Sequence, residues 1–186
     1  MKKLSLTLFA LTCLMLPTQS WAREGSSVGL LGVGDFFLTD ANPQLKIGPG
    51  GGIAIDFRFN QRWALESDFY FSIHDGKGAN AGDNSQYLLG VPNVNLKFYF
   101  MSEEANIEPY ALAGIGLYFL TEGSRSDNTG GVGMGAQIGL GVDFYVAERL
   151  SVGLSAQFRS IGLIQGNSNS SALMDFGMTG NVMYHF

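Results

Sequence analysis

The sequence predicts an all-β protein, an eight-stranded antiparallel up-and-down transmembrane β-barrel. Three observations predict it. Apolar and polar residues alternate with a period of two in six segments, which is typical of strands that have one apolar face. After residue 22 no run approaches the ~18 continuous apolar residues of a membrane-spanning helix. The connections between the predicted strands are alternately short and long.

The first 22 residues have the pattern of a cleaved secretory signal peptide. Lys2 and Lys3 precede a mostly apolar run over 4–16, and Ser20 and Ala22 are small residues at the −3 and −1 positions of a cleavage site. An N-terminal membrane helix is the alternative, but the run is shorter than the ~20 apolar residues that a span needs. We therefore expect 1–22 to be removed and 23–186 to form the barrel domain.

Composition excludes several classes of protein. The net charge is −5, with 16 acidic against 11 basic residues, so the chain lacks the basic surface that nucleic acid binding requires. A hydrophobic content of 46% argues against a disordered chain. The one cysteine excludes a disulfide framework and a cysteine metal site, and we expect no cofactor.

Six segments alternate clearly, and two more are strands with a weaker pattern. The six are 53–59, 63–74, 93–100, 132–146, 150–159 and 174–186. The segments 28–39 and 107–120 carry Gly or apolar residues on both faces, so the sequence leaves open which of their residues face inward. Pro49 and Pro92 lie near strand starts, where we expect a strand to begin later or to carry a bulge.

The connections indicate which end of the barrel is which. Short turns are expected around Gln61, at 101–106 and at 147–149. The longer connections at 40–45, 75–86, 121–130 and 162–171 are rich in Gly, Asn, Ser and Asp. Barrels of bacterial outer membranes have short periplasmic turns and long extracellular loops, so both ends of the barrel chain should lie on the periplasmic side.

Steric capacity predicts which face of the strands points outward. In the six clear segments the apolar face carries ten Phe together with Trp63 and Tyr184, whereas the other face carries mostly Gly, Ser, Asn and Gln. The interior of an eight-stranded barrel is only wide enough for its side chains to fill. We therefore predict that the apolar face contacts lipid and the polar face lines the lumen, against the alternative of a soluble barrel that buries its apolar face.

Eight charged residues fall on the predicted lumen face. They are Asp56, Arg58, Glu66, Asp68, Lys97, Asp143, Arg159 and Asp175. Pairing of neighbouring strands predicts that Arg58 reaches Glu66 and that Arg159 meets Asp175. We interpret the set as a structural network whose charges neutralise one another, and an ion gate is the alternative.

Aromatic residues of the apolar face gather toward the predicted periplasmic end. The expected membrane-interface set is Trp63, Phe98, Phe100, Phe144, Tyr184 and Phe186. Such a girdle is typical of the boundary between the hydrocarbon and the lipid headgroups.

The chain resembles the small eight-stranded outer-membrane barrels of the OmpA transmembrane-domain and OmpX type over about residues 26–186. The resemblance rests on the signal peptide, on the Pro-Tyr-Ala-Leu-Ala-Gly-Ile-Gly strand at 109–116 and on the terminal Tyr184-His185-Phe186. The family's usual terminal signal has Gly five residues before the final aromatic, where this chain has Asn181. The resemblance implies an outer-membrane location, outer-membrane lipids as partners, and recognition of Phe186 by the barrel-assembly machinery.

No arrangement of residues in the sequence predicts catalysis. A lipid A-modifying enzyme would need Ser, His and a carboxylate on the lipid face, whereas His74 and His185 fall on the lumen face and neither has an expected Ser partner. We predict a structural or surface-interaction role without catalysis, in which the loops 75–86 and 121–130 are candidates to contact an extracellular ligand. The alternatives are a narrow ion-conducting pore and, with less support, the enzyme.

Overall fold

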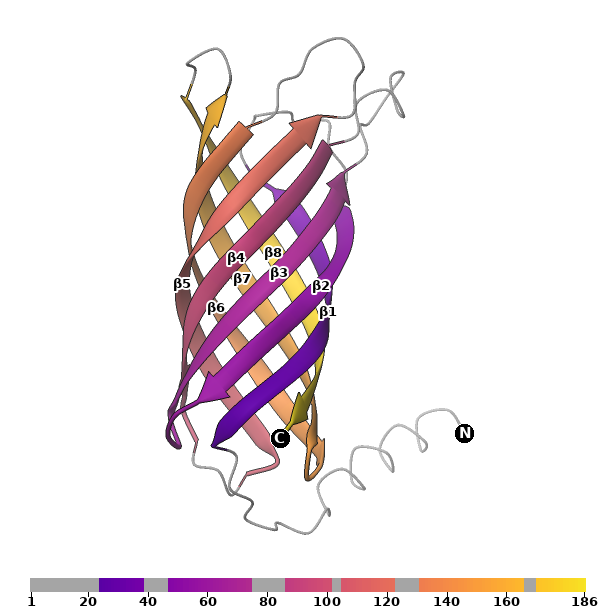
Figure 1. The fold of residues 1–186 in the computed structure, drawn as a ribbon, viewed down its shortest axis with the longest axis vertical. Coiled ribbons are helices and arrows are strands. Elements are labelled where there is room, and N and C mark those ends of the chain that lie inside the picture. The colour runs from indigo at the N-terminus through magenta and orange to yellow at the C-terminus, as the bar shows by residue number, and fades with distance from the viewer. Residues whose placement is uncertain (1–23, 39–46, 75–85, 102–104, 123–130, 166–169) are drawn as a thin grey trace, which may run out of the picture.

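Each strand of the chain pairs with the next, and the last strand pairs with the first (Figure 1). A computed structural model describes residues 24–38, 47–74, 86–101, 105–122, 131–165 and 170–186. The strands are β1 (Gly25–Phe37), β2 (Gly48–Arg58), β3 (Trp63–His74), β4 (Gln86–Tyr99), β5 (Ile107–Glu122), β6 (Gly131–Ala147), β7 (Leu150–Gln165) and β8 (Ser170–His185). The predicted signal peptide at 1–22 lies outside the described residues.

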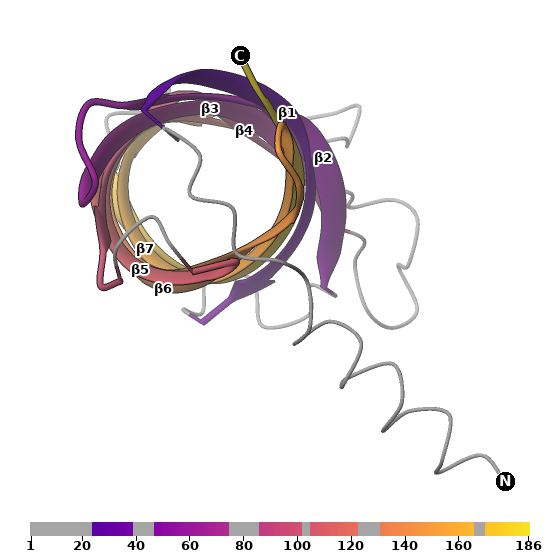
Figure 2. The same ribbon diagram turned by 90° about the horizontal axis from the view of Figure 1, so that it is seen from below.

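Antiparallel pairing of β1 with β8 closes the sheet into a ring, which Figure 2 shows along the barrel axis. The pairing runs from Ser27 opposite His185 to Phe37 opposite Asp175. Among the described residues no helix has the length and hydropathy of a membrane span. The predicted fold class, an eight-stranded closed antiparallel barrel, is confirmed.

Several strands extend beyond their predicted limits at the end of the barrel remote from the termini. β4 begins at Gln86 instead of residue 93, β7 ends at Gln165 instead of residue 159, and β8 begins at Ser170 instead of residue 174. In these extensions apolar side chains occupy both faces, as Leu88 inside and Leu89 outside show. The sequence alternation therefore disappears where the strands continue.

A register shift in β4 changes which residues face inward. Leu88 and Gly90 point into the lumen before the shift, and Asn93 and Asn95 point into it afterwards. Pro92 lies inside this irregularity, where a residue without an N–H group removes no regular ladder bond. The expected bulge at Pro92 is therefore found, although the strand begins before it.

Short connections and both ends of the barrel chain lie at the same end of the molecule (Figure 1). In the turn between β2 and β3, Asn60 Oδ1 accepts hydrogen bonds from the N–H groups of Arg62 at 2.9 Å and Trp63 at 3.0 Å. The Phe186 N–H donates to the Ser26 carbonyl at 3.1 Å. Of the predicted longer connections, 40–45 lies wholly and 75–86, 121–130 and 162–171 lie in part outside the described residues.

The outer surface of the barrel is apolar, and the charged strand residues whose side chains the structure describes point inward. Leu30 is 69% exposed and Ile138 is 62% exposed, whereas Asp56 is 6% exposed. The structure defines the orientation of the two strands that the sequence left open. Asp35 of β1 and Glu108 of β5 face the lumen and are fully buried.

The lumen is not polar throughout, in contrast to the prediction. A cluster of buried side chains, here called the apolar layer, fills it toward the end remote from the termini: Val33, Tyr70, Leu88, Tyr118, Leu120, Ile161, Leu163 and Leu173. Several of these residues belong to the strand extensions that the alternation pattern did not reveal.

The outward orientation can be tested at Leu140, which lies near the middle of β6 and is 63% exposed. Leu140→Arg places a charge in hydrocarbon, so we expect the free energy of unfolding in lipid vesicles to fall by about 2–4 kcal/mol. The control Leu140→Met keeps an apolar side chain and should change it by less than about 1.5 kcal/mol. Urea titration measures both, and equal losses for the two variants would contradict the outward assignment.

Candidate functional site

The candidate site is a network of buried charges inside the barrel. All eight charged residues predicted for the lumen are buried there. The structure adds Asp35 and Glu108, which the sequence analysis missed. Their charge itself was a usable signal, because a charged residue in a lipid-embedded strand has to face the lumen and thereby fixes the orientation of its strand.

Arg159 of β7 joins two carboxylates from neighbouring strands. Its Nη1 atom donates to Asp35 Oδ1 and to Asp175 Oδ2, at 2.7 Å each. The guanidinium also lies over the Tyr70 ring, with Cζ 4.8 Å from the ring centroid. Gly177 leaves room for this cluster, since a Cβ there would lie 2.7 Å from Asp35 Oδ1. The predicted meeting of Arg159 with Asp175 is thus present, and it includes a third residue.

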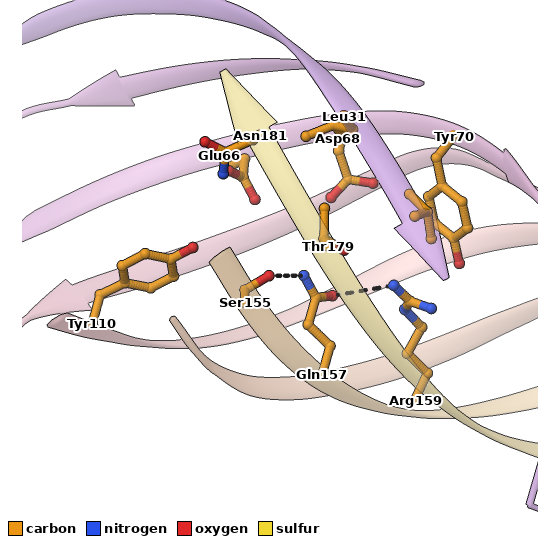
Figure 3. A pocket seen from close by; sticks show the side chains of 11 residues that line it. Leu31, Glu66, Asp68, Tyr70, Tyr110, Ser155, Gln157, Arg159, Thr179 and Asn181 are labelled. Atoms are coloured by element: carbon orange, nitrogen blue, oxygen red, sulfur yellow. Dashed lines mark hydrogen bonds between the residues drawn. The ribbon is translucent and has the colours of Figure 1, made fainter. Parts of the chain in front are cut away.

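Arg159 also continues into a row of polar side chains along β7. Its Nη2 atom donates to Gln157 Oε1 at 3.5 Å, and Gln157 Nε2 donates to Ser155 Oγ at 3.2 Å (Figure 3). The contact at 3.5 Å is at the outer limit for a hydrogen bond. These side chains extend from the cluster of Arg159, Asp35 and Asp175 toward the middle of the lumen.

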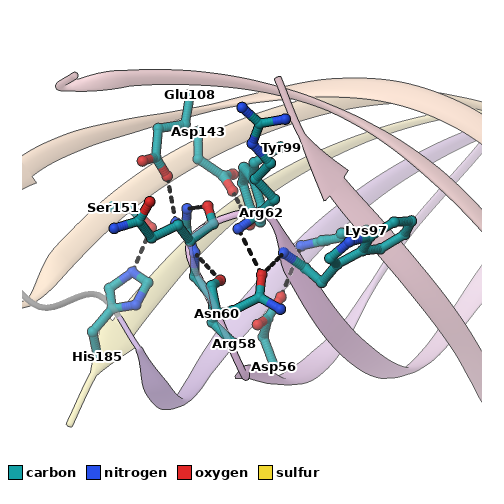
Figure 4. Close-up of polar contacts among 12 residues, drawn as sticks. Asp56, Arg58, Asn60, Arg62, Lys97, Tyr99, Glu108, Asp143, Ser151 and His185 are labelled. Carbon is teal, nitrogen blue, oxygen red and sulfur yellow. Dashed lines mark hydrogen bonds and ion pairs between the residues drawn. The ribbon is translucent and has the colours of Figure 1, made fainter. Parts of the chain in front are cut away.

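Lys97 of β4 holds together two carboxylates that face each other across β2 and β3. Asp56 and Glu66 are direct register partners, a placement in which two like charges repel. Lys97 Nζ lies 3.1 Å from Asp56 Oδ2 (Figure 4). It also forms an ion pair with Glu66. It lies 4.8 Å from the centroid of the Tyr110 ring. One buried cation thus offsets the repulsion between two carboxylates.

Arg58 does not pair with Glu66, so this sequence prediction is wrong. Its Nη1 atom donates to Glu108 Oε2 at 2.6 Å, across the lumen from β2 to β5 (Figure 4). Its Nη2 atom donates to the Gln61 carbonyl, and its Cζ lies 4.2 Å from the Tyr99 ring centroid. The prediction considered only neighbouring strands, whereas the lumen is narrow enough for a long side chain to reach the opposite wall.

Two further carboxylates receive hydrogen bonds from uncharged groups. Asp68 accepts from Asn93 Nδ2 at 2.6 Å and from Asn95 Nδ2 at 2.9 Å. Asp143 Oδ2 accepts from the Tyr99 hydroxyl at 3.0 Å. These donors are buried on the inner face of β4 and were not singled out from the sequence.

Both histidines have serine partners, which corrects the expectation that neither would. His74 Nε2 lies 3.1 Å from Ser72 Oγ, and His185 Nε2 lies 2.9 Å from Ser151 Oγ. The His74 ring stacks on Phe37 with a centroid distance of 4.2 Å. Ser72, His74 and Ser151 are buried on the lumen side, so these pairs do not lie on the lipid-facing surface.

The six aromatics expected at the membrane interface lie on the outer face, toward the end that carries the termini. Trp63 packs against Phe98 with ring centroids 4.8 Å apart. Phe98 also contacts Phe100, and Tyr184 contacts Phe186 with ring centroids 5.3 Å apart. The sixth, Phe144 of β6, is 36% exposed.

Two cavities in the described part of the lumen are small. A cavity beside Asp68, Gln157 and Arg159 has a volume of about 10 Å³, and so does a second beside Lys97 and Asp143. Each is at the lower limit for one water molecule. Within the described ranges no group of three or more His, Cys, Asp or Glu residues is placed to hold a metal ion.

Known proteins with the same architecture match this chain in sequence family and in structure. Residues 5–186 match the family model of the outer membrane protein beta-barrel domain. Neisserial surface protein A (NspA) is similar in structure, with a TM-score of 0.65 and 13% identity over 88% of this chain and 98% of that chain. OprG from Pseudomonas aeruginosa has a TM-score of 0.58 and 13% identity, covering 90% of this chain and 98% of that chain.

The attachment invasion locus protein Ail of Yersinia pestis is a third similar structure. Its TM-score is 0.56 at 15% identity, covering 88% of this chain and 99% of that chain. No curated protein matches the sequence. At these identities the structural similarity concerns the fold.

The Arg159 cluster gives a direct stability test. Arg159→Met leaves the buried carboxylates of Asp35 and Asp175 without their shared cation, so we expect the free energy of unfolding to fall by about 3–5 kcal/mol. Adding Asp35→Asn and Asp175→Asn removes those charges and should recover most of the loss. Urea titration in detergent micelles measures the variants beside the exposed control Arg149→Met. A loss for Arg159→Met no larger than for Arg149→Met would show that the cluster does not stabilise the barrel.

Proposed function

Because the chain belongs to the outer membrane protein beta-barrel domain family, we propose that it is an outer-membrane barrel with a structural or surface-interaction role that neither conducts ions nor catalyses a reaction. The observation that carries this proposal is the set of buried ion pairs that crosses the lumen. Arg159, Lys97 and Arg58 join inward-facing carboxylates from five different strands. A barrel filled in this way acts through its outer face and its ends.

The apolar layer supports a closed barrel independently of the ion pairs. An ion that crossed the lumen would have to break the contacts of Lys97 or Arg159 and then lose its hydration shell among side chains such as Leu88 and Leu163. Burying an unpaired charge in such surroundings costs several kcal/mol. The narrow-pore alternative is therefore less favoured than the structural role.

The outer face supports lipid as the main partner of the barrel. It presents apolar residues along every strand, and the aromatic residues gather at one rim. Phe186 is 74% exposed at the end of β8. We propose that residues 1–22 direct the chain across the inner membrane, and that the barrel-assembly machinery recognises Phe186.

The placement of the Ser–His pairs supports a role without catalysis. An enzyme that acts on lipid A would need its nucleophile on the lipid-facing surface. The Ser72–His74 and Ser151–His185 contacts lie on the inner side of the strands instead. A lipid acyl chain therefore has no direct route to either pair.

A surface role agrees with the sequence of the longer connections. Residues 75–86 and 121–130 are rich in polar residues, and we propose them as the contact region for an extracellular ligand. Two of the similar structures are by name a surface protein and an attachment invasion locus protein. In this role the barrel holds these connections at the outer side of the membrane.

Planar-bilayer recording tests the closed lumen. The purified protein should give no conductance steps, because ion pairs and the apolar layer close its interior. The double variant Lys97→Ala with Arg159→Ala removes two cations that span the lumen and should give more frequent current fluctuations than wild type. Reproducible steps from the wild-type protein would contradict the proposal and favour a pore.

Replacing the connections tests the surface role. A variant with Gly-Ser linkers in place of 77–84 and 123–129 should still form a heat-modifiable barrel on gels, because the paired strands are unchanged. Cells that produce it should lose attachment to surfaces to which cells with the wild-type protein attach. Equal attachment by both, at equal barrel levels, would contradict a surface role for these connections and leave the structural role.

A further inference from the structure

The described part of the lumen contains more buried carboxyl groups than Lys and Arg side chains. Seven carboxylates face three cations inside the described part of the barrel. The carboxylates are Asp35, Asp56, Glu66, Asp68, Glu108, Asp143 and Asp175, and the cations are Arg58, Lys97 and Arg159. In surroundings with few waters this excess is costly unless another positive species offsets it.

Five of the seven carboxylates share the three cations. Arg58 pairs with Glu108, while Lys97 and Arg159 each pair with two carboxylates. Of the remaining two, Asp68 receives an amide N–H donor on each oxygen. Asp143 receives the Tyr99 hydroxyl on Oδ2, whereas its Oδ1 is buried without a hydrogen-bond donor among the described residues. Asp143 is therefore the carboxylate that the described side chains satisfy least.

A second buried oxygen without a donor faces the same place. Asp143, Gly153 and Asn181 are register partners on β6, β7 and β8, so they form one row across the inner wall. Asn181 Oδ1 is buried and also has no donor in the described part of the chain. The two side chains converge over Gly153, where a Cβ would contact Asp143 Oδ1 and would lie 2.7 Å from both Oδ1 and Nδ2 of the Asn181 amide. Asp143 is 5% exposed and Asn181 is 6% exposed.

We propose that Asp143 Oδ1 and Asn181 Oδ1, above Gly153, form a binding site for an alkali cation of the Na⁺ type. Carboxylate and amide oxygens are ligands for hard cations, and a single carboxylate balances a single positive charge. The Tyr99 hydroxyl donates to the other oxygen of Asp143, so Oδ1 is left available as a ligand. Asn181 lines one of the small cavities (Figure 3) and Asp143 lines the other, so each side has space for about one water that could join the coordination.

The route to this site leads from the end of the barrel that carries the termini. The cavity that Asp143 lines is also lined by Gly25 and His185, which are the first residue of β1 and the last residue of β8. The apolar layer lies toward the opposite end. The cation would therefore enter and leave from one side only, so the site does not require a conducting barrel.

The first test compares thermal unfolding of the purified full-length protein in NaCl and in choline chloride at equal concentration. A ligand that binds only the folded state raises the unfolding midpoint. We expect a higher midpoint in Na⁺ that saturates with Na⁺ concentration. Asp143→Asn should abolish this shift and still fold, because its amide can donate to Asn181 while its oxygen continues to accept from Tyr99.

Two glycine variants form a matched pair for the same measurement. Gly153→Ala places a methyl group between the two oxygens and should abolish the Na⁺-dependent shift. Gly180→Ala is the control, because Gly180 adjoins Asn181 on β8 and its Cβ would meet Leu154 Cδ2 at 3.6 Å, an ordinary contact distance. It should keep the shift.

The second test locates the cation directly. Crystals soaked in a Tl⁺ salt should show an anomalous difference peak within coordination distance of Asp143 Oδ1 and Asn181 Oδ1. The proposal is overturned if that peak is absent, or if the wild-type midpoint is the same in Na⁺ and choline. An unfolding midpoint that changes with pH but not with Na⁺ concentration would indicate that a proton binds at this site, and it would overturn the proposal as well.

Discussion

The structure depends on the requirement that every backbone N–H and C=O group in hydrocarbon has a partner. A sheet meets this requirement only when its first and last strands pair, which β1 and β8 do here. Closure of eight strands then fixes a narrow interior and a broad exterior. Most bulky apolar side chains have space only outside, and charged side chains avoid lipid only inside. The alternation of the sequence follows from this one constraint.

The alternation allowed the fold and the orientation of six strands to be predicted, but not the strand ends. It is clear where one face meets lipid and the other is polar. It vanishes near Leu88, Leu163 and Leu173, since the lumen there is filled by apolar side chains. The three residues are nevertheless paired with residues of neighbouring strands. A pattern based on contrast cannot reveal a strand that is apolar on both faces.

Membership of the lumen network was largely predictable, whereas its pairing was not. A charged side chain in a lipid-embedded strand has to face the lumen, and this reasoning also applies to Asp35 and Glu108. The partner of Arg58 depends on which opposite wall the folded ring brings near, and no neighbouring-strand register contains that information. Glycines such as Gly177 add a further condition, because they leave room for a long side chain from the next strand.

The central claim is that apolar side chains of the strands face lipid while the lumen is filled from within. The most direct measurement is NMR cross-relaxation from lipid acyl-chain protons to isoleucine methyl groups, in wild-type protein reconstituted in nanodiscs. Ile138 and Ile115 are 62% and 61% exposed on the outer face, whereas Ile161 is fully buried in the apolar layer. Cross-peaks to the lipid are predicted for Ile138 and Ile115 and not for Ile161. Cross-peaks at Ile161 with none at Ile138 would contradict the account.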